Sequence, residues 1–173
     1  MRFDRLAQTA ASDRLDGLFI FGRHFQPAFF PLAERLRERG CAVSLVVSAP
    51  DESRLLSALE ARRSARSVTV LTADGSVGQR GQVADHVDDL VRRSDADVVY
   101  AAGPRDVLRS AAAAAERAGA WSQVAVEAPT PCGTGLCHGC PLPVVGEDGV
   151  ERVVRACTEG PVVRGDRVQW DAL

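Results

Sequence analysis

The chain has 173 residues, of which 46% are hydrophobic and 25% are charged, and its formal net charge is −2. This length and composition predict one ordinary domain with a real core and a small additional part. The sequence has no long basic run and no apolar stretch long enough to cross a bilayer, so neither nucleic acid nor a membrane is an expected partner. All 21 basic residues are arginine.

Short apolar runs alternate with amphipathic segments over the first 127 residues. The runs predict strands at 17–21, 42–47, 68–71, 97–101 and 123–126. The amphipathic segments predict helices at 27–39, 51–63, 82–93 and 105–118. This alternation predicts an α/β fold, with a doubly wound parallel sheet of five strands.

Two of the predicted helices have a clear apolar face. The residues expected to point inward are Phe30, Leu32, Ala33 and Leu36 in the first helix, and Val83, Val87, Leu90 and Val91 in the third. Cys41 starts an apolar run and is expected to be a buried core thiol. Trp121 is expected to pack in the core or at an edge, and Trp170 over the C-terminal part.

Regular structure is predicted to stop after the fifth strand, because residues 128–131 read APTP. We therefore place a domain boundary there. Residues 1–127 form one predicted domain, and residues 128–173 form a second, smaller one.

Four cysteines lie in this smaller domain. Cys132, Cys137 and Cys140 have the spacing C-x4-C-x2-C, and Cys157 follows after sixteen intervening residues. This is the plant-type ligand order of a [2Fe–2S] cluster, in which three thiolates come from one loop and the fourth returns from elsewhere. The glycines between the cysteines suit a loop that needs positive φ angles and close backbone approach.

Other readings of the cysteines explain the spacing less well. A disulfide framework is not expected in a chain without a signal peptide, and we expect a reduced, cytoplasmic setting. Structural zinc is the competing hypothesis, although zinc ribbons usually have two C-x2-C pairs. A mixed site of the Rieske kind would need a second histidine beside His138.

The order of these motifs resembles a known family, the electron-transfer subunits of NAD-linked dihydroorotate dehydrogenases, within the wider ferredoxin-reductase family. The cysteine loop is the most specific match. Residues 72–78, TADGSVG, are similar to the family's T-x-D-G-S-x-G segment, and residues 100–104, YAAGP, to its Y-x-C-G-P turn. Glu127 lies five residues before Cys132, as the family's glutamate does, and residues 159–163, EGPVV, resemble the segment after the last ligand.

The resemblance also implies a nucleotide cleft, for which the candidate residues are Gly22, Asp74, Gly75, Gly103 and Pro104. Asp74 is equally readable as a turn former. In place of the family's G-G-x-G-x-A-P loop, residues 22–27 read GRHFQP, and Ala102 replaces the cysteine near the nicotinamide. The β-barrel that holds FAD in the family is not found in the sequence. We therefore expect the isolated chain to carry no FAD and to bind NAD(P)H poorly.

The sequence therefore predicts an electron-transfer protein with one [2Fe–2S] cluster and no catalytic side chain. Its expected partners are redox proteins, either a flavoprotein or a dehydrogenase subunit, and Leu136, His138 and Pro141 are candidates for the exposed rim of the cluster. One alternative is an NAD(P)H-dependent reductase component that uses FAD from a separate chain. A second alternative is a binding module without redox function, in which zinc holds the C-terminal loop.

Overall fold

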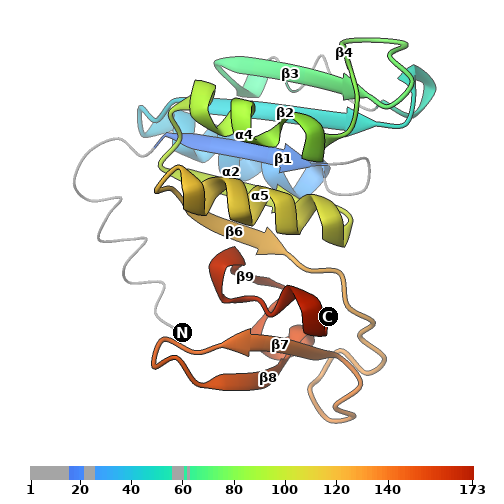
Figure 1. The fold of residues 1–173 in the computed structure, drawn as a ribbon, viewed down its shortest axis with the longest axis vertical. Coiled ribbons are helices and arrows are strands. Elements are labelled where there is room, and N and C mark those ends of the chain that lie inside the picture. The colour runs from blue at the N-terminus through green and yellow to red at the C-terminus, as the bar shows by residue number, and fades with distance from the viewer. Residues whose placement is uncertain (1–15, 22–25, 56–60, 62) are drawn as a thin grey trace.

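A seven-stranded sheet forms the centre of the protein (Figure 1). The structure is a computed structural model that describes residues 16–21, 26–55, 61 and 63–173. Its strands are β1 (Gly17–Phe21), β2 (Val43–Ala49), β3 (Ser67–Thr72), β4 (Gln79–Arg80), β5 (Val98–Ala102), β6 (Trp121–Ala125) and β9 (Val162–Arg164), in the spatial order β4-β3-β2-β1-β5-β6-β9. Neighbouring strands are parallel except β6 and β9, which are antiparallel.

The predicted doubly wound sheet is confirmed, and all five predicted strands are present. From β1 the chain builds outward through β2 and β3, and then returns to add β5 and β6 on the other side. The topological switch point therefore lies between β1 and β5. Two short strands, β4 and β9, extend the sheet at its two edges beyond the five that were predicted.

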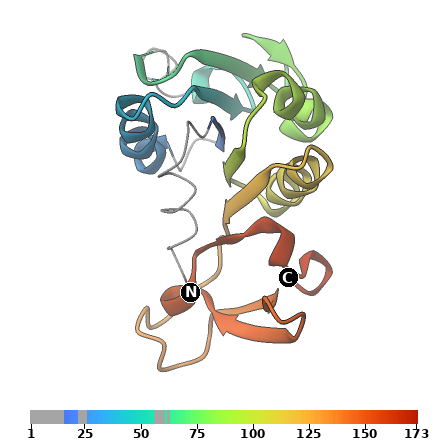
Figure 2. The same cartoon turned by 90° about the vertical axis from the view of Figure 1, so that its left-hand side faces the viewer.

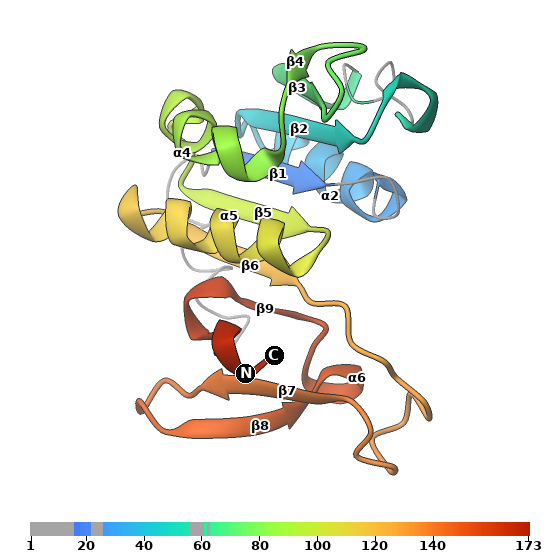
Figure 3. The same cartoon turned by 45° about the vertical axis from the view of Figure 1, so that its right-hand side comes forward.

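Helices cover both faces of the sheet (Figures 2 and 3). Helices α4 (Val83–Ser94) and α5 (Arg105–Arg117) lie on one face, and α2 (Gln26–Glu38) lies on the other. Strand β1 shows both layers. Leu18 and Ile20 belong to the core under α4 and α5, whereas Phe19 and Phe21 belong to the core under α2. All five residues of β1 are buried, as expected for a central parallel strand.

The predicted apolar face of α4 is confirmed, because its buried residues are Val83, Val87, Leu90 and Val91. At the start of this helix the Gln82 N–H donates to the Asp85 carboxylate at 2.9 Å, as in a capping box. In α2, Ala33 is buried, and Phe30 and Leu36 pack against the core. The prediction for Leu32 is wrong, because its side chain points outward and is 37% exposed.

The helix predicted over 51–63 does not begin where the sequence suggested. Residues Glu52–Arg54 form a single 3₁₀ turn, η1, and Leu55 is extended. The Asp51 side chain accepts from the Arg54 N–H at 3.1 Å, which closes this tight turn. The local capping bond therefore favours a 3₁₀ turn over a continuing α-helix. Residues 56–60 and 62 lie outside the described residues.

The C-terminal part is a hairpin that remains joined to the sheet. Strands β7 (Pro141–Val145) and β8 (Glu151–Arg155) form the hairpin, and a short helix, α6 (Ala156–Glu159), follows it. The chain then returns as β9, beside the end of β6, where the Val126 N–H donates to the Pro161 carbonyl at 3.0 Å. Leu142 of β7 lies in the same core as the sheet and α5. The domain boundary after residue 127 stays a prediction.

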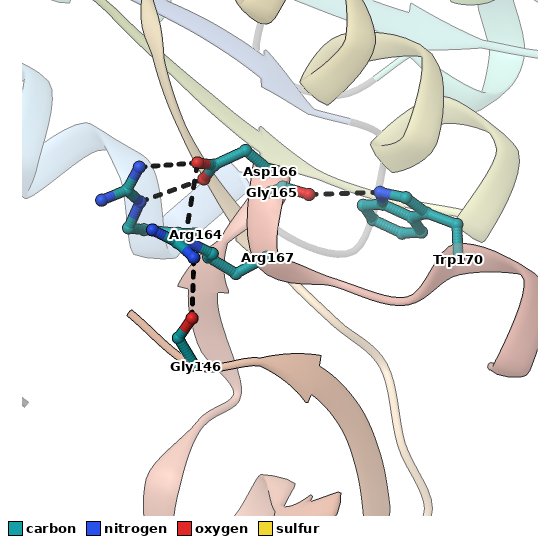
Figure 4. Close-up of polar contacts among 6 residues, drawn as sticks. All are labelled: Gly146, Arg164, Gly165, Asp166, Arg167 and Trp170. Atoms are coloured by element: carbon teal, nitrogen blue, oxygen red, sulfur yellow. Dashed lines mark hydrogen bonds and ion pairs between the residues drawn. The ribbon is translucent and has the colours of Figure 1, made fainter. Parts of the chain in front are cut away.

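The last residues hold the hairpin against α5 (Figure 4). In the turn η2 (Gly165–Arg167), Arg167 Nη1 donates to the Gly146 carbonyl of the hairpin loop at 2.7 Å. Trp170 Nε1 donates to the Gly165 carbonyl at 3.2 Å, and its ring packs against the common core. A Cβ atom on Gly165 would lie 2.7 Å from the Cβ of Ala112 in α5. The turn η2 is therefore packed closely between the two parts of the molecule.

Two other predictions concern the opposite end of the sheet. Trp121 lies at the start of β6, where it is 40% exposed and the Arg164 guanidinium lies 4.4 Å from its ring centroid. Cys41 is half-buried, so the prediction of a buried core thiol is wrong. It follows the end of α2 and lines an open cavity of about 410 Å³ together with Asp16, Arg37 and Arg66. Within the described ranges, no helix has the length and apolar character needed to span a membrane.

Candidate iron–sulfur site

The four predicted ligands lie on two segments that the hairpin brings together. Cys132, Cys137 and Cys140 lie on the coil between β6 and β7, and Cys157 lies on α6, directly after β8 (Figure 3). The pairing of β7 with β8 continues one step beyond the strands, because the Ala156 N–H donates to the Cys140 carbonyl at 2.9 Å. This bond holds the third and fourth cysteines side by side.

Cys140 and Cys157 lie in direct sulfur contact. Their Sγ atoms are 3.3 Å apart, and the Cys140 thiol donates to the Cys157 sulfur. Cys140 is only 1% exposed, and Cys157 is half-buried. The neighbouring Cys140 thiol and burial raise the pKa of Cys157. Two sulfurs at this distance can also bind a common metal ion when they are deprotonated.

Backbone N–H groups surround the other two sulfurs. The Thr134 and Cys137 N–H groups both donate to Cys132 Sγ at 3.5 Å, and the Gly139 N–H donates to Cys137 Sγ at 3.3 Å. Such donors stabilise a thiolate, which is the form that binds metal. The Cys137 N–H, followed by the hydroxyl and N–H of Thr134, lowers the pKa of the Cys132 thiol to about 5.

The loop conformation explains why these N–H groups point at sulfur. Gly133 and Gly135 have φ angles of 64° and 81°, and His138 has a φ of 54°, a left-handed conformation that few non-glycine residues adopt. These turns fold the chain around the cysteines. A Cβ atom on Gly135 would lie 2.8 Å from the Thr158 side chain, so glycine is also needed there for close packing.

Arg155 is a site residue that the sequence reasoning missed. Its Nη1 donates to the Gly135 carbonyl at 3.1 Å, and its Nε lies 3.9 Å from the Glu159 carboxylate. It thereby fixes the cysteine loop to the end of β8. No sequence pattern predicts this contact, because Arg155 reaches the loop only through the pairing of β7 with β8.

The chemistry of the donor set fits an iron–sulfur cluster. The four thiols come from two segments, one pair is in sulfur contact, and the other two accept backbone N–H bonds of the kind that tune cluster potentials. The described residues contain no group of three His, Cys, Asp or Glu side chains arranged as ligands of a single metal ion.

The predicted nucleotide residues lie on separate loops after β3 and β5. Asp74 follows β3, and Gly103 and Pro104 follow β5, so all three lie at the carboxyl end of the parallel strands. Strands β2 and β1 lie between β3 and β5. Three strand spacings separate them by roughly 14 Å. The Asp74 carboxylate accepts from the N–H and hydroxyl of Ser76 at 2.9 and 2.7 Å, which is the geometry of a turn former. Gly22 lies outside the described residues.

Glycines shape the loop that contains Asp74 and Gly75. Gly75 has a φ of 78°, and Gly78 has a φ of 73°. A Cβ atom on Gly78 would lie 2.2 Å from the Val70 carbonyl oxygen, which belongs to the backbone of β3 and has no room to move.

Alanine at Gly78 is therefore expected to destabilise the protein by about 2–4 kcal/mol, since left-handed strain adds to a backbone clash. Gly119 provides the matched control, because its φ is also 73° and no atom lies within 4 Å of its Cβ position. Gly119→Ala should lower the free energy of unfolding only by the strain of a left-handed alanine, about 1–2 kcal/mol. Urea denaturation measures both variants, and equal losses would contradict the clash at Gly78.

Comparison with known proteins supports the iron–sulfur site. Residues 130–169, which contain all four cysteines, match the family model of the iron-sulfur cluster binding domain of dihydroorotate dehydrogenase B. An electron transfer subunit homolog of dihydroorotate dehydrogenase B from Thermotoga maritima is 31% identical over 144 residues, which are 83% of this chain and 49% of that protein. A probable electron transfer subunit from Methanopyrus kandleri is 33% identical over 132 residues, 76% of this chain and 47% of that protein.

Solved structures show the same relationship. A structure of an NADH-dependent reduced ferredoxin-NADP oxidoreductase has a TM-score of 0.75 and 29% identity, over 92% of this chain and 56% of that one. The C-terminal domain of a hydrogenase from Pyrococcus furiosus shares the fold alone, at a TM-score of 0.52 and 15% identity, over 65% of this chain and 92% of that one. The chain spans about half the length of the curated relatives named above.

The resemblance seen in the cysteine loop is thus confirmed. Residues 130–169 belong to the iron–sulfur cluster binding domain family of dihydroorotate dehydrogenase B, and most of the chain is similar to the electron transfer subunits of that enzyme.

Proposed function

We propose that this protein carries one [2Fe–2S] cluster on Cys132, Cys137, Cys140 and Cys157 and transfers single electrons between protein partners. The observation that carries the proposal is the sulfur contact between Cys140 and Cys157, at 3.3 Å, within a matched family region that contains all four cysteines. When bound, the cluster would accept and release one electron at a time.

The protein's own residues would supply ligation, tuning and access. Cys140 and Cys157 would anchor the cluster against the core, because Cys140 is buried. The N–H groups of Thr134, Cys137 and Gly139 would stabilise negative charge on sulfur. Cys137 is exposed, so electrons would enter and leave on its side of the loop.

The partners would be a flavoprotein or a dehydrogenase subunit. The relatives are named as electron transfer subunits of a dehydrogenase, and a similar solved structure is that of an NADH-dependent flavin-based enzyme. This chain spans only about half of those proteins. We assign the cluster step to this chain because the matched family region contains its four cysteines.

Protein purified without oxygen should contain about two irons and two sulfides per chain and be reddish-brown. Reduction with dithionite should bleach the visible absorption and produce a signal in electron paramagnetic resonance. Zinc in equal amount to protein, without sulfide, would instead support the alternative of a structural metal site.

The reductase alternative makes a different prediction about nucleotide. Because residues 22–27 read GRHFQP in place of the glycine-rich loop that approaches the pyrophosphate, we expect NADH to bind weakly and to leave the cluster oxidised. Titration calorimetry and anaerobic absorption spectra test both points. A dissociation constant near 1 µM, about −8 kcal/mol, or cluster reduction by NADH alone, would favour the reductase.

A further inference from the structure

Cys140 and Cys157 lie in a geometry close to that of a disulfide bond. Both side chains are free thiols, and their Sγ atoms are 3.3 Å apart. A disulfide bond is about 2.0 Å long, so the two sulfurs need to approach by only about 1.3 Å to form one. Small rotations of the two side chains supply a shift of this size, and the backbone can keep its course.

The backbone holds the two residues at neighbouring positions of the hairpin. One step beyond the paired strands β7 and β8, the Ala156 N–H donates to the Cys140 carbonyl at 2.9 Å. Cys140 therefore lies opposite Ala156, and Cys157 is the next residue. Opposed residues of an antiparallel pair have Cα atoms about 4.5–5.5 Å apart, and disulfides join Cα atoms about 4.4–6.8 Å apart. The hairpin thus brings the pair close to the range that a disulfide requires.

The sulfurs of Cys132 and Cys137 are held in a different way. Cys132 Sγ accepts two backbone N–H groups, and Cys137 Sγ accepts the Gly139 N–H. An ionised acceptor makes a stronger hydrogen bond than a neutral one, so these bonds are strongest to a thiolate. A disulfide between Cys132 and Cys137 would weaken them. Oxidation of the chain should therefore come to rest at Cys140 and Cys157.

We propose that Cys140 and Cys157 form a reversible disulfide with each other whenever the chain holds no cluster, with a low-molecular-weight disulfide such as oxidised glutathione as the oxidant. Cys157 is half-buried, so its sulfur attacks the small disulfide, forms a mixed disulfide and releases one thiol. The buried sulfur of Cys140 then attacks the Cys157 sulfur and releases the second thiol. The protein loses two electrons and two protons, and the small disulfide becomes two thiols.

The disulfide would protect two of the four proposed ligands from further oxidation. A free thiol can be oxidised through sulfenic acid to sulfinic acid, which thiols do not reduce. A disulfide, in contrast, is returned to two thiols by a dithiol through the same exchange chemistry. The chain would therefore accept a cluster again after reduction. This consequence rests on the proposed function, whereas the disulfide itself does not.

Peptide mapping of the complete, cluster-free chain tests the proposal. Iron is removed with a chelator without oxygen, the chain is equilibrated with excess oxidised glutathione, and the remaining thiols are alkylated. Cleavage after arginine places Cys157 in the peptide 156–164 and the other three proposed ligands in the peptide 118–152. We expect these two peptides to be cross-linked, with fragmentation assigning the bond to Cys140. Dithiothreitol should separate them again.

Two controls accompany the mapping. Cys137→Ser keeps the pair and should give the same cross-link, and Cys41, in the separate peptide 40–54, should stay outside it. Cys140→Ala removes the partner of Cys157. After glutathione and then excess hydrogen peroxide, this variant should contain at least about fivefold more sulfinic acid at Cys157 than the unaltered chain. The cross-link is measured on the unaltered chain and does not depend on how Cys140→Ala folds.

Three results would overturn the disulfide proposal. They are a bond between Cys132 and Cys137 in place of the expected one, a Cys157 that stays free or bound to glutathione at equilibrium, and equal sulfinic acid at Cys157 with and without Cys140. Failure of the proposed function would look different. The cross-link would form and be reduced as expected, but the reduced chain would take up no cluster from ferrous iron and sulfide.

Discussion

Serine in place of Cys140 is expected to abolish the cluster and to destabilise the folded protein. The substitution removes one of the four proposed thiolate ligands and also disrupts the sulfur pair with Cys157. Cys140 is only 1% exposed, so the new hydroxyl group would be buried where the thiol had been. An unsatisfied buried hydroxyl costs about 1–3 kcal/mol. Both effects act in the same direction, so the variant should lose its cluster and also unfold more easily.

Cys157→Ser should give a similar loss, and Cys132→Ser and Cys137→Ser should give bleached or unstable clusters. Cys41→Ser is the matched control, because Cys41 lies at the opposite end of the sheet and lines a separate cavity. Iron and sulfide analysis, absorption spectra and thermal denaturation of anaerobic protein measure the series. Full iron and sulfide in Cys140→Ser would show that the ligand set is wrong.

Alanine in place of Leu142 is expected to destabilise the whole molecule. Leu142 is fully buried on β7, two residues after Cys140, and its core is shared with the sheet and α5. Shortening a buried leucine to alanine costs about 2–5 kcal/mol, through lost transfer free energy and the cavity that remains. Since a single core connects both parts, the hairpin and the sheet should unfold together.

Val153→Ala provides the control for this experiment. Val153 lies on the neighbouring strand but is 69% exposed, so its truncation should change stability by less than about 0.5 kcal/mol. Denaturant unfolding is followed by far-ultraviolet circular dichroism for the sheet and by visible absorption for the cluster. Two separate transitions, with Leu142→Ala shifting only the cluster transition, would contradict a shared core.

The sequence was most informative where apolar spacing and chain order reflect a repeated physical pattern. The five main strands follow from short apolar runs between helices, and the inward face of α4 follows from the spacing of its valines. The cysteine spacing pointed to the segment that matches the iron–sulfur family. These patterns are local in the sequence. They predict the strands because a strand of a parallel sheet is buried on both faces and is therefore apolar along its length.

Contacts between segments that are distant in the sequence could not be predicted from such local patterns. Strand β9 has only three residues, and its place beside β6 is fixed by the hairpin that precedes it. The same applies to Arg155, which reaches Gly135 across 20 positions in sequence. The first turn after β2 also departed from expectation, because the Asp51 side chain closes a 3₁₀ turn.

The candidate nucleotide residues illustrate a limit of motif reasoning. A motif such as TADGSVG can be retained because its residues shape a turn. The Asp74 carboxylate accepts hydrogen bonds from the N–H and hydroxyl of Ser76 in that turn. Gly78 is required by the close approach of the Val70 carbonyl. The residues therefore have structural explanations on this chain, and nucleotide binding by them stays a prediction.

The two outer strands of the sheet have a consequence for association and aggregation. At one edge lies β4, with two residues, and at the other lies β9, with three, whereas the strands between them have five to seven residues. Long unpaired edges are templates on which a foreign strand can add, and short edges protect against this. Pro161 directly before β9 and Arg80 within β4 further disfavour such addition. The seven-stranded sheet therefore gives other chains little opportunity to extend it, which should direct associations on this side of the molecule to side-chain surfaces.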